Sequence, residues 1–431
     1  MSPDQYQCVT VDGGVPGCSP GSCADGGVCD EATSTCVACT DDTHCATGAL
    51  KACRAATNSC VACTEDKHCT GDLKACDPST NGCVGCVTND HCGGDQGICD
   101  PSAKSCVQCL NDGQCTTATT PICDNKACRG CKTDSECTGP GVCMEDGHCA
   151  AETEVVYVEF DPATCPNTTA NGSSTKPYCA PNDAVAVLSG PKRVIIIRGP
   201  MDAKMAISTN AVSPVVIGRK SAAGADASIP AGAGTAVLLT AGDTLIRDLK
   251  VVGGTGTASR GIVATGAATK VRLLGVRASL TPMGLGIQVD GGAQIRMDRC
   301  LVDNNPAGGI LINGAGYDIQ NTIVASNGGY GIQINASVAP SRFWFNTVAS
   351  NPVAATCNLN STDSLDASII IGPVTNCPVS SNTVTSTSSL GPTFHLTASV
   401  PCPNAPANPP DHDFDGDPRP VPVDCGADQY P

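Results

Sequence analysis

Apolar and polar residues alternate along short segments in the second half of the chain, roughly between Thr244 and Asn351. Alternation is the spacing of a β-strand with one buried face. The segments also recur, since Ile295, Ile319 and Phe343 follow one another at equal intervals. Glycine and asparagine stand between the segments, where the backbone must enter left-handed conformations. A strand-and-turn pattern that returns at a nearly constant interval predicts a solenoid of parallel strands, stacked coil on coil.

The length of the repeat decides between kinds of solenoid. About 23 residues do not hold two strands and a helix of ordinary length, which disfavours leucine-rich and helical repeats. A β-sandwich with irregular strands is the other all-β architecture to consider, but its hairpin turns would not return at a constant interval. From Val194 to Ile371 we expect about eight coils, which at ~4.8 Å per coil make a body about 40 Å long.

From Cys18 onward the first third of the chain shows a pattern of cysteines instead. They form six units of four, joined by Cys-x-x-Cys pairs. Four sulfurs per unit fit one tetrahedral zinc site or two disulfides equally well. Histidines precede a cysteine in three units, as extra zinc ligands would, but Gln114 and Glu136 occupy the matching positions of later units. We therefore favour disulfides. The three histidines are expected to be solvated turn residues: His44, His68 and His91.

These units contain few valine, isoleucine or leucine residues, so cross-links must replace a hydrophobic core. Each disulfide is expected to contribute about 2–4 kcal/mol by constraining the unfolded chain. In the five units from Cys39 onward, the third residue after the opening cysteine carries a short side chain with an oxygen, which suits an Asx turn bonded to the backbone ahead. The residues at this position are Asp42, Asp66, Asn89, Asp112 and Asp134.

The chain contains 32 cysteines in 431 residues, which implies an oxidising compartment. Cys8 precedes the six units and has no evident partner, whereas Cys300 lies within a coil and is expected to be a buried thiol. Three local disulfides are expected outside the units: Cys165–Cys179, Cys357–Cys377 and Cys402–Cys425.

Charge and hydropathy exclude some classes of partner. The formal net charge of −16 disfavours nucleic acid and anionic membranes. No stretch approaches the length of a transmembrane helix. The first residues, MSPDQYQC, lack the basic and apolar regions of a signal peptide, so we expect that an export leader is missing from this version of the chain. An extracellular or cell-surface location is the expectation that reconciles these features.

The changes of pattern divide the chain into four parts. They are an N-terminal tail (1–17), a cysteine-rich repeat region (18–150), a solenoid with an N-terminal cap (151–395) and a C-terminal capping segment (396–431).

The entry to the solenoid carries a family resemblance. A strand at Val155–Phe160 is followed by a short helix at Asn182–Leu188, capped by Asn182 or Asp183, and by a buried strand at Val194–Arg198. This order, with the sequence KPYCAPNDAVAVLSGPKRVIIIRGP, resembles the entry of bacterial right-handed parallel β-helix proteins, the pectate-lyase-like superfamily. The resemblance implies an all-β chain with a right-handed parallel β-helix, preceded by a disulfide-rich, loop-dominated repeat region. The four-cysteine units resemble those of bacterial surface proteins and, distantly, the Dickkopf-type fold.

The tail from Asp411 to Tyr430 resembles the closing segment of many bacterial β-helix proteins. The resemblance implies a cap on the last coil, with Arg419 paired to nearby acids. The sequence DHDFDGD also begins like an EF-hand calcium loop, but Pro422 stands at the twelfth place, which needs a bidentate glutamate. A full EF-hand is excluded, and a looser Ca²⁺ site is a prediction. Its ligands would be Asp411, Asp413, Asp415 and Asp417.

The same superfamily implies two kinds of activity against acidic polysaccharides. Its hydrolases need clustered aspartates with a histidine, and no histidine occurs between Tyr157 and Phe394, which disfavours that branch. Its lyases need Ca²⁺ on carboxylates and an arginine or lysine base. No cluster of three carboxylates is visible beside the solenoid's arginines. The sequence therefore predicts no catalytic residue.

One row of outward residues is a candidate for binding an acidic sugar chain. Arg272 is expected to stack beside Arg296, with Asp298 on the same face, and Gln320 and Trp344 are expected to continue the row. The alternative is a solvated outer face with one exposed tryptophan. Our interpretation is a secreted or cell-surface, non-catalytic protein for adhesion, matrix or glycan binding, whose partner is an extracellular polysaccharide or another surface protein. The rival hypothesis is a Ca²⁺-dependent polysaccharide lyase.

Overall fold

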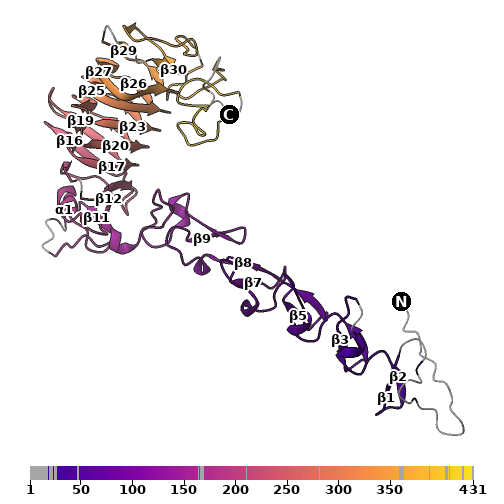
Figure 1. The fold of residues 1–431 in the computed structure, drawn as a ribbon. Coiled ribbons are helices and arrows are strands. Elements are labelled where there is room, and N and C mark those ends of the chain that lie inside the picture. Colours follow the sequence, from indigo (N-terminus) through magenta and orange to yellow (C-terminus); the bar gives the residue numbers. More distant parts are fainter. Residues whose placement is uncertain are drawn as a thin grey trace, which may run out of the picture. The chain divides into compact units, whose positions relative to one another are not determined.

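The chain folds into two compact units, Met1–Ala150 and Ala151–Pro431, which are described separately (Figure 1). Cys8 and the predicted tail 1–17 lie outside the described residues. No helix in the described part of the chain is long and apolar enough to cross a membrane. The computed structural model describes residues 18, 23, 27–45, 48–163, 165, 169–209, 211–280, 282–358, 364–387, 389–402, 406, 408–419 and 422–429.

The first unit repeats a small motif of a 3₁₀ turn and an antiparallel hairpin. The hairpins are β1 (Val28–Asp30) with β2 (Thr35–Val37), β3 (Ala52–Arg54) with β4 (Ser59–Val61), β5 (Ala75–Asp77) with β6 (Gly82–Val84), β7 (Ile98–Asp100) with β8 (Ser105–Val107), and β9 (Ile122–Asp124) with β10 (Ala127–Arg129). The turns are η2 (Asp42–Cys45), η3 (Asp66–His68), η4 (Asn89–His91), η5 (Asp112–Gln114) and η6 (Asp134–Glu136).

Two disulfides cross-link every repeat. The first cysteine of a unit pairs with the third and the second with the fourth, as in Cys63–Cys76 and Cys69–Cys83. The predicted disulfides are therefore confirmed over zinc, because a sulfur bonded to another sulfur is no longer a thiolate ligand. The three predicted local pairs are confirmed as well. Cys300 is a buried free thiol, and burial raises its pKa to about 12, which makes it unreactive.

The aspartate or asparagine at this position bonds across the repeat rather than to its own turn. Asp42 Oδ1 accepts a hydrogen bond from the backbone N–H of Cys53 at 2.8 Å, and Asp66 Oδ1 accepts one from Cys76 at 2.7 Å. The expected Asx turn within the 3₁₀ turn is wrong, because the side chain bonds the backbone N–H of the third cysteine instead. The side chain instead fastens the third cysteine, and therefore the hairpin, to the 3₁₀ turn.

The histidines were expected to be solvated, and for His68 and His91 that expectation is wrong. His68 Nδ1 accepts the backbone N–H of Glu65 at 3.3 Å, while its Nε2 lies 2.9 Å from Asp42 Oδ2 of the preceding repeat. His91 Nε2 contacts Asp66 in the same way. A neutral ring protonated on Nε2 satisfies both kinds of contact.

Gln114 takes the same backbone role as these histidines, since its Oε1 accepts the N–H of Leu110 at 2.6 Å. Histidine, glutamine and glutamate can alternate at this position because each offers an acceptor to the start of the turn.

The second unit is a solenoid whose coils each contribute strands to three parallel stacks. The first stack contains β13 (Met205–Ile207), β16 (Thr235–Leu239), β19 (Arg260–Thr265), β22 (Leu285–Asp290), the first halves of β25 (Gly308–Gln320) and β27 (Tyr330–Trp344), β29 (Val353–Cys357) and β32 (Val374–Thr375). The second contains β11 (Val155–Glu159), β12 (Val194–Arg198), β14 (Val215–Arg219), β17 (Gly242–Arg247), β20 (Thr269–Leu274), β23 (Gln294–Asp298), the second halves of β25 and β27, and β30 (Leu365–Asp366). The third contains β15 (Ser228–Gly232), β18 (Lys250–Gly254), β21 (Arg277–Ser279), β24 (Leu301–Asp303), β26 (Ile323–Ala325), β28 (Thr347–Ala349) and β31 (Ile369–Ile370).

The predicted parallel solenoid is confirmed, although the count of coils differs. The described strands make seven complete coils, from β13–β15 to β29–β31, where eight were expected. The expected count began at strand β12, which extends the second stack before the first complete coil and, within the described part of the chain, has no partner strands in the other two stacks.

The helix α1 (Pro181–Ala186) begins at Pro181, so the predicted cap at Asn182 or Asp183 is wrong. Asn182 Oδ1 instead accepts the backbone N–H of Ala206 at 2.8 Å and satisfies a donor on strand β13.

Buried asparagines satisfy the backbone at the corner that follows the third stack. Asn327 Nδ2 donates to Val302 O and to Asn351 Oδ1, both at 3.0 Å. Asn327 Oδ1 in turn accepts from the Asn305 side chain at 2.9 Å, so the three form a ladder along the solenoid. Gly309 makes room for it, because a Cβ there would lie 3.0 Å from Asn327 Nδ2. The ladder pairs polar groups that would otherwise be buried without partners.

Asn327→Ala is expected to lower the free energy of unfolding of the solenoid by about 3 kcal/mol, because it leaves buried donors of Asn305 and a backbone carbonyl unpaired. The shift in the midpoint of urea unfolding, followed by tryptophan emission, measures it. Asn335→Ala removes an exposed asparagine and should cost no more than about 0.5 kcal/mol. Equal midpoints for the two variants would contradict a structural role for the ladder.

Candidate functional site

The five residues predicted to bind a glycan all lie on the outward face of the second stack, but register divides them into two rows. Arg272 pairs with Arg296, and Arg296 pairs with Asp318. Gln320 lies beside Asp298 and not beside Arg296. The expected continuation from Arg296 to Gln320 and Trp344 is therefore wrong, because this coil is shorter than the spacing of the matching segments suggests. A slip of two residues keeps the same side chains outward, so the alternation of the sequence could not reveal it.

The first row, Arg272, Arg296, Asp318 and Arg342, is called the groove row. Its first three members border a shallow groove of ≈ 200 Å³ over strands β17, β20, β23 and β25. Other polar residues lining the groove are Asp243, Lys270 and Gln294.

The groove contains paired and unpaired charges. Arg272 Nε lies 3.3 Å from Asp243 Oδ1, and Arg342 makes a two-pronged contact with Asp318 at 3.0 and 3.1 Å. Lys270 and Arg296 are exposed and form no ion pair with any residue that the structure describes. Within the described part of the chain, the groove therefore presents two free cations, while both of its carboxylates are neutralised by arginine.

The second row, Asp298, Gln320 and Trp344, is called the covered row because the C-terminal segment lies on it. We call the described residues within 389–429 the C-terminal strap. Gln320 is 5% exposed and Trp344 is 7% exposed, so the expected exposed tryptophan is wrong. Trp344 belongs to a buried cluster that includes Val423 of the strap, and the Arg342 guanidinium lies 3.8 Å from the centre of its ring.

The strap also covers the outward side of the third stack. Ile323 and Ala325 pack with Ala427 of the strap, together with Phe394 and Phe414. These contacts explain why outward positions of the last coils are apolar. The disulfide Cys402–Cys425 closes a loop within the strap, and a hydrogen bond from the Ala427 N–H to Thr347 Oγ1 at 3.0 Å fastens the strap to strand β28.

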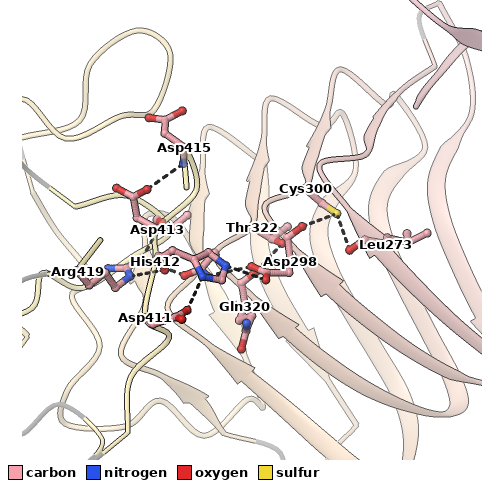
Figure 2. Close-up of polar contacts among 12 residues, drawn as sticks. Leu273, Asp298, Cys300, Gln320, Thr322, Asp411, His412, Asp413, Asp415 and Arg419 are labelled. Carbon is pink, nitrogen blue, oxygen red and sulfur yellow. Dashed lines mark hydrogen bonds and ion pairs between the residues drawn. The ribbon is translucent and has the colours of Figure 1, made fainter. Parts of the chain in front are cut away.

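His412 fastens the strap to Asp298 of the covered row, as Figure 2 shows. Its Nε2 lies 3.0 Å from Asp298 Oδ2, and its Nδ1 lies 2.5 Å from Asp411 Oδ1. The two residues are 114 positions apart in the sequence, so no local pattern of histidine and aspartate predicts their contact. Both ring nitrogens are engaged by carboxylates. The arrangement therefore holds the strap and offers no free nitrogen for proton transfer to a substrate.

The contact between His412 and Asp298 shifts both pKa values in the direction that favours the ion pair. The hydrogen bond with Asp298 raises the pKa of His412 above its usual 6.5. Burial opposes ionisation of Asp298, but the hydrogen bonds from His412 and Asn321 outweigh it and lower the pKa of Asp298 below 3.8. Because the pKa of His412 is raised, its contribution to stability is lost as the pH rises through that pKa. Because the pKa of Asp298 is lowered, its contribution is lost as the pH falls through that pKa. The contact of the strap with Asp298 is therefore most stable at pH values between the two pKa values.

Arg419 is the buried centre of the strap. It was expected to pair with nearby acids, but each of its hydrogen bonds to described residues goes elsewhere. The acceptors are Asn321 Oδ1 and the backbone carbonyls of His412, Asp424, Gly426 and Ala427. Burial lowers the pKa of Arg419 to about 10, although the charges of Asp413, Asp428 and Asp424 oppose that shift. The guanidinium orders the closing turn by binding carbonyl oxygens.

Three of the four aspartates predicted to hold calcium have side chains in contact with protein partners, while Asp417 is exposed. Asp413 is 2% exposed, and its carboxylate accepts the backbone N–H groups of Asp415, Asp417 and Gln429. Asp411 contacts His412, and Asp415 lies 3.1 Å from His395 Nδ1. Converging carboxylate oxygens are what Ca²⁺ requires. A calcium ion at this loop stays a prediction.

Two buried N–H groups near the strap have no acceptor within the described part of the chain. They are Nε1 of Trp344 and Nε of Arg299. Arg299 lies beside the strap, since a Cβ on Gly416 would be 2.7 Å from its Nη1. Each orphaned donor costs about 1–3 kcal/mol relative to a hydrated one. The interface is therefore less stable than its buried apolar area alone would make it.

Comparison with known proteins agrees with the architecture. Residues 236–399 match the family described as a right handed beta helix region. The solenoid is a right-handed β-helix. The crystal structure of pectate lyase Pel9A is similar over 64% of this chain and 96% of that chain, with 13% sequence identity and a TM-score of 0.34. A likeness of that size carries no argument about activity. No curated protein matches the sequence.

Arg419→Gln is expected to destabilise the β-helix by about 2–4 kcal/mol, because it removes the buried cation and leaves carbonyl oxygens without their donor. The midpoint of urea unfolding, followed by the emission of Trp344, measures the loss. Lys270→Gln, which changes an exposed cation of the groove, is the matched control and should shift stability by less than about 0.5 kcal/mol. An unchanged midpoint for Arg419→Gln would mean that the strap does not depend on its buried centre.

Proposed function

We propose that the β-helix is a non-catalytic binding module for an acidic glycan, and that the groove is its contact surface. The observation that carries the proposal is the pair of exposed cations without partners among the described residues, Lys270 and Arg296, on adjacent strands. An exposed cation that no acid of the same chain neutralises is available to an anionic ligand. The protein as a whole carries a net charge of −16, so a local cationic groove stands out from the rest of its surface.

The spacing of the groove supports a linear polyanion. Arg272 and Arg296 stand on neighbouring strands of one parallel sheet, about 4.8 Å apart along the solenoid axis. A chain of uronate sugars lying along that axis would place successive carboxylates over successive strands. Guanidinium groups bind carboxylates through two parallel hydrogen bonds, which favours arginine for this role.

The rival proposal is a Ca²⁺-dependent lyase on the same groove, with Arg296 as the base. Its exposed guanidinium is the observation that favours this alternative. A lyase would also need carboxylates free to hold calcium, and those of Asp243 and Asp318 are each bound to an arginine. We therefore propose binding without cleavage.

The proposal places the protein in an extracellular or cell-surface setting. Two disulfides in every cysteine-rich repeat suit an oxidising compartment, as do the three in the second unit. The cysteine-rich unit would then serve as a cross-linked spacer, with each repeat joined to the next by contacts such as His68–Asp42 and Lys126–Asp100. Adhesion to a matrix polysaccharide is the role that these parts would serve together.

Binding of polygalacturonate by the full chain, measured by isothermal titration calorimetry, tests the proposal. Arg296→Ala combined with Lys270→Ala is expected to weaken binding by about tenfold or more, because each charge-assisted hydrogen bond contributes about 1.5–3 kcal/mol. Added salt should weaken the wild type more than the double variant. Lys250→Ala, a cation on the third stack paired with Asp226, is the matched control and should bind like the wild type.

Absorbance of unsaturated products, followed in the same samples with added Ca²⁺, separates the two proposals. Binding without any rise in absorbance supports the module. A rise that Arg296→Ala abolishes would establish the lyase instead, and failure of the wild type to bind the polymer would remove both.

A further inference from the structure

We propose that each cysteine-rich repeat is also a redox-controlled metal site, in which its four sulfurs hold one Zn²⁺ ion when its two disulfides are reduced. The proposal goes beyond glycan binding and concerns only the first unit. It rests on the convergence of the sulfurs, on a repeat core that is made of cysteine, and on contacts that hold the cysteines together without sulfur bonds.

The sulfurs of both disulfides converge at one place within a repeat. In the repeat that opens at Cys63, the Sγ atoms of Cys63, Cys69 and Cys83 all lie within 4.8 Å of one another. The fourth sulfur, that of Cys76, is bonded to Cys63 and belongs to the same cluster. Zn²⁺ binds four thiolates tetrahedrally at ~2.3 Å, which places the sulfurs about 3.8 Å apart. The four sulfurs therefore need only short shifts to surround one ion once the two bonds between them are opened.

The core of a repeat consists of these cysteines. In the repeat that opens at Cys39, the buried cluster contains Cys39, Cys45 and Cys53, with Cys60 packed against it. Reduction removes the cross-links from such a core. A metal ion that binds only the folded repeat would then supply the folding free energy that the disulfides supplied, as in small zinc domains. The same three-sulfur convergence recurs at Cys39, Cys45 and Cys60, at Cys86, Cys92 and Cys106, and at Cys109, Cys115 and Cys128.

Contacts that involve no sulfur bond also hold the four ligands together. The backbone N–H of Cys63, ahead of the 3₁₀ turn, donates to Asn81 O at 3.1 Å in the hairpin. Cys76 and Cys83 face each other across the paired strands β5 and β6. Asp66 Oδ1, in the turn, accepts the N–H of Cys76 at 2.7 Å. The turn and the hairpin therefore keep direct contacts with each other when the disulfides are opened.

The proposed ligand set is four thiolates without histidine. His68 lies in the same turn, but its Nδ1 accepts the N–H of Glu65 and its Nε2 contacts Asp42, so both ring nitrogens are engaged. The repeat that opens at Cys109 has Gln114 at this position and forms the same sulfur cluster. Four sulfur ligands favour a thiophilic ion such as Zn²⁺ over Ca²⁺ or Mg²⁺.

The exchange of two disulfides for one metal ion needs four electrons per repeat. A dithiol reductant supplies them: two dithiol molecules are oxidised to cyclic disulfides, and the two disulfides of the repeat become four thiols. Four protons leave as the thiols bind Zn²⁺ as thiolates. In the reverse direction, a small-molecule disulfide oxidises the thiolates, the two disulfides of the repeat form again, and Zn²⁺ is released. The repeat therefore binds metal under reducing conditions and gives it up under oxidising ones.

Titration of the reduced full chain with Co²⁺ tests the proposal. The disulfides are opened with a phosphine, which does not chelate the ion as a dithiol would, and the absorbance of tetrahedral cobalt–thiolate sites is followed without oxygen. The absorbance is expected to saturate at one Co²⁺ per repeat, six per chain, with the bands of four-sulfur coordination. Zn²⁺ should displace the Co²⁺, and the oxidised chain should bind neither ion.

Cys69→Ser combined with Cys83→Ser removes one disulfide from one repeat and is expected to lower the end point by one ion. Cys165→Ser combined with Cys179→Ser removes a disulfide of the second unit and is the matched control, with an unchanged end point. His68→Gln should leave the end point and the bands unchanged, because His68 is not a ligand. A reduced wild type that binds no Co²⁺, or an end point that does not fall when Cys69 and Cys83 are replaced, would overturn the proposal. So would bands of mixed sulfur and nitrogen coordination.

Discussion

Hydrogen bonding between successive coils is the constraint on which the rest of the second unit depends. Each strand pairs with the strand one coil earlier and one coil later, so inward isoleucines such as Ile287, Ile310 and Ile332 must stack in line. The corners must also satisfy their backbone groups, which the ladder through Asn327 accomplishes with side-chain amides. This register also fixes which outward side chains lie next to one another on successive coils. Charged residues at paired positions therefore form rows along the solenoid axis.

The strap buries one of the two rows of the second stack and leaves the other exposed to solvent. Where outward residues of the last coils are apolar, as at Ile323, strap residues such as Ala427 cover them. Two residues of the strap contact this part of the solenoid. His412 contacts Asp298 of the covered row, and Arg419 donates a hydrogen bond to Asn321, which follows Gln320 of that row. The groove row lies two residues away along the same strands and keeps exposed cations. The protein therefore separates buried cations that hold its own structure from exposed cations that are available to the proposed ligand.

The period and the cysteine count were enough to predict the parallel solenoid and the two disulfides of each repeat, because strand alternation and local pairing are both short-range features. Neighbours across coils were harder to predict. Coils differ slightly in length, so Arg296 meets Asp318 and not Gln320. The contact of His412 with Asp298 spans 114 residues and leaves no local signal. In the first unit, the exchange of histidine for Gln114 concealed a shared acceptor role that only the contacts reveal.

Arginine-selective labelling with phenylglyoxal, followed by peptide mass spectrometry with and without polygalacturonate, tests the separation of working and structural cations most directly. The account predicts that Arg296 is labelled rapidly and is protected by the polymer, whereas Arg419, which is 9% exposed, stays protected in both conditions. Labelling of Arg419 as fast as that of Arg296, or no effect of the polymer on Arg296, would contradict it.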